Sequence, residues 1–262
     1  MKKQIRAGVA NTLNGIADAQ RVRSQVFVKE KGLLSREAIS LDREVDIYDD
    51  LETTLHFVAY VEDVPVGTSR LIGPNPDVAR AIGQPLGIDL ASRYDLDPFV
   101  VAGVSLAEVS RMCIVPEYRG TAVLHALYLA MYDESLRVGL THWIGAGNAE
   151  TDALEDAEIA YRIAQRDGLV SSRWHVAPRP NASADGPATR PLYSAAERAQ
   201  AGAGDLQGLR FPRTLATFAQ LAARYMGRPI RERGYTVCSL PLVVDLTDVV
   251  GTRVFQRAFG HS

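Results

Sequence analysis

The stretch that decides the fold is Ile114-Val115-Pro116-Glu117-Tyr118-Arg119-Gly120-Thr121-Ala122-Val123-Leu124. A β-rich run ends at Pro116, and an apolar helical pattern begins at Thr121. Gly120 permits a tight turn between the two, because glycine has no Cβ to restrict its backbone. The first amides of a helix have no acceptor within that helix, so they can point at an anion. The stretch therefore predicts a strand, an anion-binding turn and a helix.

Two common phosphate-binding loops do not fit this turn. It lacks the Gly-Lys-Ser/Thr sequence of nucleotide-hydrolysing loops, and it lacks the three glycines of the dinucleotide-binding fingerprint. Nucleotide hydrolysis and NAD binding are therefore disfavoured.

The segments on both sides alternate between strand and helix patterns. Apolar spacing predicts a helix from Ile16 to Lys31 that ends at Gly32, and two β-rich runs around Glu62-Asp63 predict a hairpin. Further strands are expected at 106–115, 143–146 and 237–246, and further helices at 121–138, 153–168 and 215–226. This mixture predicts an α/β or α+β fold, with a mixed, mostly antiparallel central sheet flanked by helices. The Pro-, Ala-, Gly- and Ser-rich stretch 179–208 predicts an inserted loop or lid near 170–210.

Composition narrows the classes of protein. The chain has 262 residues, 47% of them hydrophobic and 23% charged, which is typical of a folded protein, and we expect a single domain spanning 1–262. With a net charge of -2, the chain as a whole has no positive electrostatic field that would attract nucleic acid. No run of eighteen uncharged apolar residues predicts a membrane span, so we expect a cytoplasmic protein. Cys113 and Cys238 are expected as buried thiols, and five scattered histidines predict no metal site.

The order of these elements, with Gly120-Thr121-Ala122 in the turn, resembles the GCN5-related N-acetyltransferase (GNAT) superfamily, whose phosphate-loop pattern is Gln/Arg-x-x-Gly-x-Gly/Ala. Glu117 stands where that pattern has Gln or Arg. The chain is also similar to the acyl-homoserine lactone synthases, which use acyl carrier protein thioesters. The residues that carry this similarity are Arg23, Val26-Phe27, Glu44-x-Asp46-x-x-Asp49, Arg70-Leu71 and Glu108-Val109-Ser110-Arg111. Tyr225-Met226-Gly227-Arg228-Pro229-Ile230 and the following strand resemble long-chain N-acyl amino acid synthases and ornithine-lipid N-acyltransferases.

Forming an amide from a thioester and an amine requires a base, because an α-amine with a pKa of about 8 is largely protonated at neutral pH. Glu108 is the candidate base, directly or through one water. An ion pair with Arg111 or Arg70 is an equally good interpretation of this carboxylate. Tyr225 is the candidate general acid for the leaving thiolate, and a core role is the alternative suggested by its place on an apolar face.

The thioester donor is expected along the strand and the turn. If a bulge frees the amides of Met112 to Ile114 from the sheet, they can stabilise the oxyanion, while the same strand edge pairs with the pantetheine arm and the phosphate lies at the turn. The predicted donor-binding residues are Met112, Cys113, Ile114, Val115, Arg119, Gly120, Thr121, Ala122 and Val123. Neither cysteine has a neighbouring histidine, so direct attack by the amine is expected rather than a covalent enzyme intermediate.

The resemblance implies that the acidic run contributes to the acceptor site, with Asp46 and Asp49 attracting an ammonium group. The predicted substrate-binding residues are Arg23, Phe27, Asp46, Asp49, Arg70 and Arg111. A solvated loop, or salt bridges from the acidic residues to those three arginines, explains the same run.

The resemblance thus implies an N-acyltransferase that moves a medium or long acyl chain from an acyl carrier protein or acyl-CoA thioester to the amine of an amino acid or similar small molecule. It implies acyl-CoA or acyl-phosphopantetheine as co-substrate, acyl carrier protein as a partner, and no permanently bound cofactor. Two alternatives stay open. One is an acyl-homoserine lactone synthase, and the other is a non-catalytic module that binds acyl or phosphopantetheine ligands, which the departure at Glu117 favours.

Overall fold

The structure, a computed structural model, describes residues 4–33, 42–253 and 255–256. The chain divides into two compact units. The first holds residues 1–89 and 105–143, and the second holds residues 90–104 and 144–262. The expectation of a single domain over 1–262 stays a prediction.

The first unit is built on four antiparallel strands in the order β1 (Ile5–Val9), β2 (Thr54–Val61), β3 (Val64–Ile72) and β4 (Leu106–Ile114). The predicted hairpin is confirmed, since β2 and β3 pair on either side of Glu62 and Asp63. Both turn residues have positive φ, 50° and 68°, which matches the twist that a two-residue hairpin needs.

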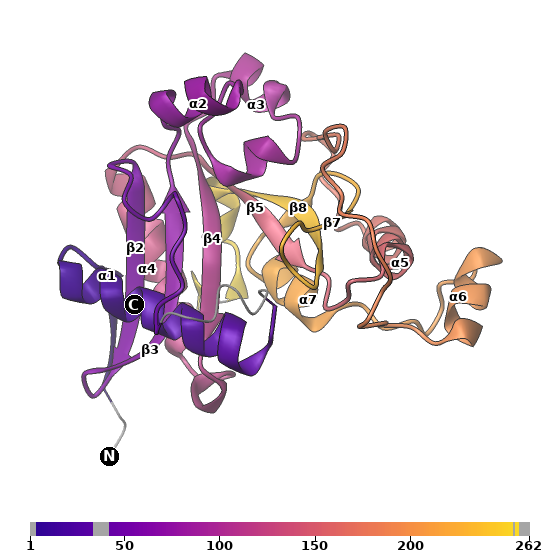
Figure 1. The fold of residues 1–262 in the computed structure, drawn as a ribbon, viewed down its shortest axis with the longest axis horizontal. Coiled ribbons are helices and arrows are strands. Elements are labelled where there is room, and N and C mark those ends of the chain that lie inside the picture. Colours follow the sequence, from indigo (N-terminus) through magenta and orange to yellow (C-terminus); the bar gives the residue numbers. More distant parts are fainter. Residues whose placement is uncertain (1–3, 34–41, 254, 257–262) are drawn as a thin grey trace. The chain divides into compact units, whose positions relative to one another are not determined.

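Two helices cover opposite faces of these strands (Figure 1), with α1 (Leu13–Arg23) in front and α4 (Val123–Arg137) behind. The helix α1 packs on β2, β3 and β4, whereas α4 packs on β1, β2 and β3. Gly67 of β3 allows the close approach of α4, because a Cβ there would lie 3.0 Å from Val123 and 3.1 Å from Leu127. The helix expected from residue 121 is therefore the one that closes this face.

The predicted first helix is present, but its last turns differ from an ordinary α-helix. Thr12 caps α1 by accepting a hydrogen bond from the Gly15 amide at 3.1 Å. After Arg23 the helix continues as a π-helix, η1 (Ser24–Glu30), and Gly32 follows with φ of +55°. The remaining elements of this unit are α2 (Pro76–Ile82), η3 (Asp89–Ser92), which straddles the boundary, and η4 (Pro116–Tyr118).

The second unit contains α3 (Asp97–Ala102), α5 (Leu154–Arg166), α6 (Ala195–Gly202), α7 (Arg213–Gln220), β6 (Arg224–Tyr225), β7 (Ile230–Arg231), β8 (Cys238–Asp245) and α8 (Leu246–Val249). The chain enters it within β5 (His142–Asn148), which neighbours β8; β6 and β7 pair antiparallel with β8. Phe99 of α3 stacks on Trp174 with ring centroids 4.3 Å apart. The mixed, mostly antiparallel α/β class expected from the sequence is confirmed.

The helix predicted over 215–226 is wrong in its second half. It ends at Gln220, and Ala222 takes a left-handed φ of +69°, so that Tyr225 becomes part of β6 opposite Leu242. Pairing with β8 overrides the helical spacing of these apolar residues.

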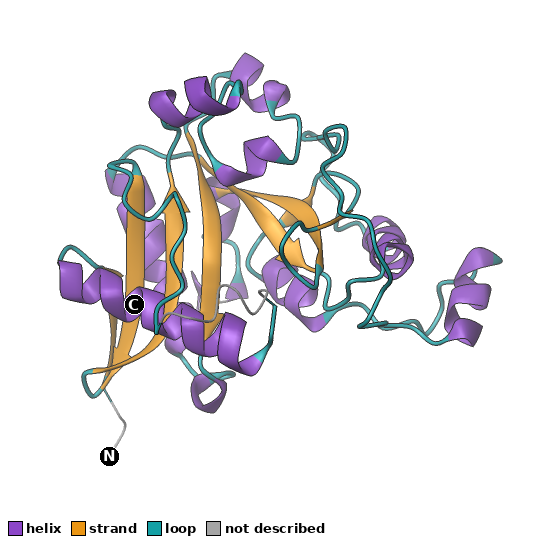
Figure 2. Cartoon of the chain, viewed as in Figure 1, coloured by secondary structure: helices purple, strands orange, loops and turns teal. Residues whose placement is uncertain are grey.

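The stretch 170–210 is largely irregular apart from α6, as Figure 2 shows by its long teal connections. Two buried carboxylates of the α5 region hold it. Asp152 accepts hydrogen bonds from the amides of Thr189 and Arg190, and Asp156 accepts from those of Leu192 and Tyr193.

Among the described residues, no helix has both the length and the apolar character needed to cross a bilayer. The described ranges also hold no group of three or more His, Cys, Asp or Glu side chains arranged to bind a metal ion.

Candidate active site

A β-bulge interrupts β4 at Arg111 and Met112, directly before Cys113 and Ile114, which pair with Thr68 and Gly67 of β3. Thr68 of β3 pairs with Cys113 and Arg70 pairs with Ser110, so the single residue Ser69 lies opposite both Arg111 and Met112. Arg111 has φ of +54°, the left-handed conformation found in one class of bulge. A bulge leaves its extra residue outside the ladder, and the β4 backbone can therefore offer a peptide group to a ligand at this point.

The predicted anion turn follows β4 directly. After η4, Gly120 adopts φ of +72° and α4 begins at Val123, while the N-cap residue Ala122 provides no side-chain hydrogen bond. The Thr121 hydroxyl donates to the Tyr118 carbonyl at 2.6 Å, which tightens the turn. Within the described residues, the amides of Ala122 and Leu124 donate to no protein acceptor. These amides carry the partial positive charge of the helix terminus and can receive a phosphate.

Arg119 lies beside this turn but is already engaged. Its Nη1 and Nη2 atoms donate to both carboxylate oxygens of Glu30 on η1, at 2.7 and 2.5 Å, and its Nε donates to the Ile114 carbonyl at 2.9 Å. Hydrogen bonding to Arg119 lowers the pKa of the Glu30 carboxyl below its usual value. Arg119 therefore ties the turn to η1, and its side chain stays 40% exposed.

Val115 does not fit the donor-binding role expected of its backbone. Its amide donates to the Val66 carbonyl at 3.0 Å, so the β3 to β4 ladder resumes after the bulge and consumes that group. Cys113 is buried, and burial raises the pKa of its thiol to about 12, which keeps the sulfur protonated. Cys113 is therefore unsuited to act as a nucleophile, in agreement with direct attack by the amine.

Glu108 lies on β4 two residues before Ser110, opposite Ile72 of β3, and only 1% of its surface is exposed. Of the two ion pairs considered for it, the one with Arg70 does not form in the described part of the chain, since Arg70 donates to Asp46, Asp49 and Ser110 instead.

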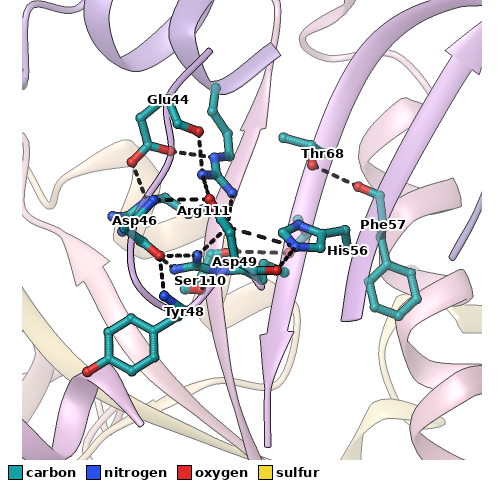
Figure 3. A network of polar contacts seen from close by, with 12 residues as sticks. Glu44, Asp46, Tyr48, Asp49, His56, Phe57, Thr68, Ser110 and Arg111 are labelled. Carbon is teal, nitrogen blue, oxygen red and sulfur yellow. Dashed lines mark hydrogen bonds and ion pairs between the residues drawn. The ribbon is translucent and has the colours of Figure 1, made fainter. Parts of the chain in front are cut away.

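Five of the six predicted substrate-binding residues come together in one largely buried network, and Glu44 completes it. Figure 3 labels Glu44, Asp46, Asp49 and Arg111 of this network. Arg23 donates to both oxygens of Asp49, at 2.7 and 2.6 Å, and its Nε bonds Glu44. Arg70 donates to both oxygens of Asp46, at 2.6 and 2.9 Å, and also to Asp49 at 2.6 Å. Arg111 completes the set with Glu44 at 3.0 Å and Asp46 at 2.7 Å.

The network is electrically balanced, because three guanidinium groups face three carboxylates. Burial opposes ionisation of Asp49, but hydrogen bonding and the charges of Arg23 and Arg70 outweigh it and hold the pKa of Asp49 well below its usual range. Burial likewise opposes ionisation of Asp46, and Arg70 and Arg111 keep its pKa low. The salt-bridge interpretation of the acidic run therefore describes this structure, and the solvated-loop interpretation is wrong.

His56 on β2 borders the network, where it lies next to Asp49. The sequence did not predict this position, because the five histidines are scattered and form no motif. The Nε2 of His56 lies 3.0 Å from the Asp49 carbonyl oxygen, so Nε2 carries a hydrogen and donates it to that oxygen. Burial lowers the pKa of His56, which keeps the ring neutral.

The place of Glu44 in the network could have been predicted from the alternation Glu44-Val45-Asp46-Ile47, in which the acidic side chains turn inward and the aliphatic ones are exposed. Phe27 is half-buried on η1.

Tyr225, the predicted general acid, belongs to the second unit. It is fully buried in the second unit, where its hydroxyl donates to the Leu215 carbonyl at 2.7 Å, and burial raises the pKa of the phenol far above its usual value. This environment favours the core role over the general-acid role.

Comparison with known proteins gives a consistent result. Residues 18–153 match the family model described as N-acyl amino acid synthase FeeM. A curated relative, L-ornithine N(alpha)-acyltransferase of Rhizobium meliloti (strain 1021), is 29% identical over 182 residues, which cover 66% of this chain and 59% of that protein. The protein of the same name from Agrobacterium fabrum (strain C58) is 26% identical over 170 residues, covering 62% and 56%. The match thus spans less than two thirds of each relative's length.

Among solved structures, that of FeeM, an N-acyl amino acid synthase from uncultured soil microbes, superposes with a TM-score of 0.54 at 9% identity and covers 98% of this chain and 99% of that one. At this identity the likeness shows a shared fold.

Proposed function

The chain belongs to the N-acyl amino acid synthase FeeM family, and from this membership we propose that it is an N-acyltransferase that joins an acyl chain to the α-amine of an amino acid. The observation that carries the proposal is the succession of a β-bulge, a turn and a helix start within residues 110–123. This one continuous segment combines a bulge, where the regular strand pairing is interrupted, with helix amides that have no protein acceptor.

The donor is an acyl thioester of CoA or of a carrier-bound phosphopantetheine. Its phosphate lies at the amides that open α4, and its pantetheine arm runs along β4 toward the bulge. The thioester carbonyl then accepts a hydrogen bond from a bulge amide, which stabilises the oxyanion as it develops. Holding donor and amine in this arrangement supplies much of the rate by proximity.

Glu108 is the base. It takes a proton from the acceptor ammonium, directly or through one water, and the neutral amine attacks the thioester carbonyl. The C–N bond forms, the C–S bond breaks, and the attacking nitrogen then loses a second proton. Of the two protons that nitrogen gives up, one goes to the leaving thiolate and the other to solvent. The products are an amide and a free thiol, and no side-chain nucleophile takes part.

The acceptor is an α-amino acid, with ornithine the first to test. Both curated relatives are named L-ornithine N(alpha)-acyltransferases, and this supports an α-amine as the nucleophile. Because three arginines occupy Asp46 and Asp49, those carboxylates are poor candidates for holding the acceptor ammonium.

The test is to incubate the purified protein with long-chain acyl-CoA or acyl carrier protein and a pool of amino acids that includes ornithine, and to detect amides by mass spectrometry. The proposal expects an N-acyl amino acid and one equivalent of free thiol. A parallel reaction with S-adenosylmethionine tests for a lactone product. Binding of the thioester without any amide would instead support the non-catalytic module.

A further inference from the structure

We propose that Arg111 is a positioning residue, whose guanidinium is held by Glu44 and Asp46 so that the β4 bulge keeps its left-handed form and the donor site stays open. The buried charge network would then serve the thioester donor rather than the acceptor amine. This inference rests on the proposed function, because it concerns the donor site of the same reaction.

The starting point is the backbone of Arg111. It sits inside a strand with φ of +54°, a conformation that a residue with a Cβ adopts only at a cost. Asn and Asp can lower that cost because their short polar side chains hydrogen-bond locally, whereas arginine is not a residue type that favours this conformation. A residue stays in such a conformation only when contacts with the surrounding structure hold it there.

Those contacts come from the acidic run. The Nε of Arg111 donates to Glu44 at 3.0 Å, and its Nη2 donates to Asp46 at 2.7 Å. Both carboxylates are in turn fixed by arginines that are nearly fully buried, Glu44 by Arg23 of α1 and Asp46 by Arg70 of β3. The guanidinium of Arg111 is thus anchored, through the acidic run, to both α1 and β3.

The residue before the bulge is tied to the same network. The Ser110 hydroxyl accepts a hydrogen bond from the Nε of Arg70 at 3.0 Å, on the strand that pairs with β4. Two successive residues of the bulged strand are therefore held by charged groups outside the ladder. The network therefore fixes the position of the bulge in β4.

The backbone conformation gives a clean experiment, since glycine adopts positive φ without penalty and alanine does not. Arg111→Gly and Arg111→Ala remove the same guanidinium and leave the same two carboxylates without it, so they differ only in how well they hold the bulge. If Arg111 positions the bulge, both variants lose activity, but the glycine variant keeps a kcat/KM for the thioester about tenfold higher than the alanine variant. We expect the KM for the amine to be equal in the glycine and alanine variants.

Two other roles give different results. A guanidinium that binds the acceptor raises the KM for the amine equally in both variants, with no rescue by glycine, and this result overturns the proposal. A guanidinium that only stabilises the fold lowers the melting temperature, more in the alanine variant than in the glycine variant, but both then keep a wild-type kcat/KM for the thioester wherever they are folded. That result overturns the proposal as well. If neither variant folds, Asp46→Asn replaces them. The proposal then expects a higher dissociation constant for a non-hydrolysable acyl-CoA thioether, and a raised KM for the amine alone contradicts it.

Failure of the proposed function is seen separately in the wild-type protein, which would then neither transfer an acyl group nor bind the thioether. In that case, hydrogen exchange at the Met112 amide still tests the bulge. Faster exchange in the wild type and the glycine variant than in the alanine variant supports a held-open bulge, and equal exchange in all three overturns it.

Discussion

Arg23 and Asp49 form a two-pronged ion pair in the interior of the first unit, with Nη1–Oδ1 at 2.7 Å and Nη2–Oδ2 at 2.6 Å and with only 1% and 0% of the two side chains exposed. Arg23 comes from the last turn of α1, and Asp49 from the acidic run that precedes β2. The pair therefore fixes the acidic run to the helix that covers the front of the sheet.

Removing the charge of Asp49 is expected to destabilise the protein strongly. Asp49→Asn leaves two buried guanidinium groups short of a counter-charge, and breaking a buried ion pair in this way costs about 3–5 kcal/mol of unfolding free energy. Urea denaturation measures the loss. Asp63→Asn is the control, because Asp63 pairs with Arg6 at the surface and its removal is expected to cost less than about 1 kcal/mol. Equal losses for both variants would contradict the assignment.

The same carboxylate predicts how stability depends on pH. Its pKa is lowered by folding, so its contribution is complete above the pKa of the unfolded chain, about 3.9, and is lost as the pH falls toward the lower folded value. Unfolding free energy measured from pH 7 downward should therefore fall below about pH 4 in the wild type. Asp49→Asn should show a shallower fall, and parallel curves would contradict this prediction.

Glu108→Gln is expected to lower kcat/KM by about 10²–10⁴-fold, since a general base contributes that much and the amide cannot take a proton. The rate of amide formation is followed across pH in the wild type and in the variant. Glu52→Gln, at an exposed position before β2, is the matched control and should keep wild-type rates. Full activity of Glu108→Gln at every pH would remove Glu108 as the base.

Gly120→Ala is expected to raise the KM for the thioester, because Gly120 has φ of +72° and an added Cβ forces the anion turn to change its backbone. Gly139→Ala gives a close control, since Gly139 has φ of +76° at the other end of α4 and, like Gly120, has open space where an added Cβ would lie. Both variants should lose about 1–2 kcal/mol of stability. Only Gly120→Ala should change the KM, and an equal KM effect would show that strain alone is responsible.

Tyr225→Phe is expected to keep the turnover number while losing about 1–3 kcal/mol of unfolding free energy, because the buried Leu215 carbonyl loses its donor. Steady-state rates and thermal melting measure the two effects. A large fall in turnover with unchanged stability would restore the general-acid role.

Asp156→Asn is expected to loosen the segment around Leu192. The Asp156 carboxylate is fully buried, accepts two amides of that segment and pairs with Arg198 at 2.6 Å, which keeps its pKa low despite burial. Limited trypsin digestion should therefore cut the variant faster after Arg198, which Ala199 follows. Asp167→Asn, which breaks an exposed pair with Arg166, should leave the digestion rate unchanged. No difference between the two variants would show that the carboxylate does not restrain this segment.

Local signals in the sequence determined much of what matters here. The turn at Gly120, the hairpin at Glu62-Asp63 and the helix that ends before Gly32 each follow from residues that are adjacent in the chain, since backbone freedom and hydrophobic period act over a few residues. The same local information placed Glu108 and Arg111 on one strand. Local spacing misled at Tyr225, where strand pairing with residues nearly twenty positions away outweighed the helical pattern.

Only the tertiary structure decided which charges meet. Arg23, Asp49, Arg70 and Arg111 lie 21 to 88 positions apart, and the sequence allowed both an open acidic pocket and a closed set of ion pairs. Their pairing depends on how α1, β3 and β4 pack, because a buried carboxylate takes whichever guanidinium the packing brings within hydrogen-bonding distance. The left-handed backbone of Arg111 is a product of the same packing, since its side-chain type alone does not favour it.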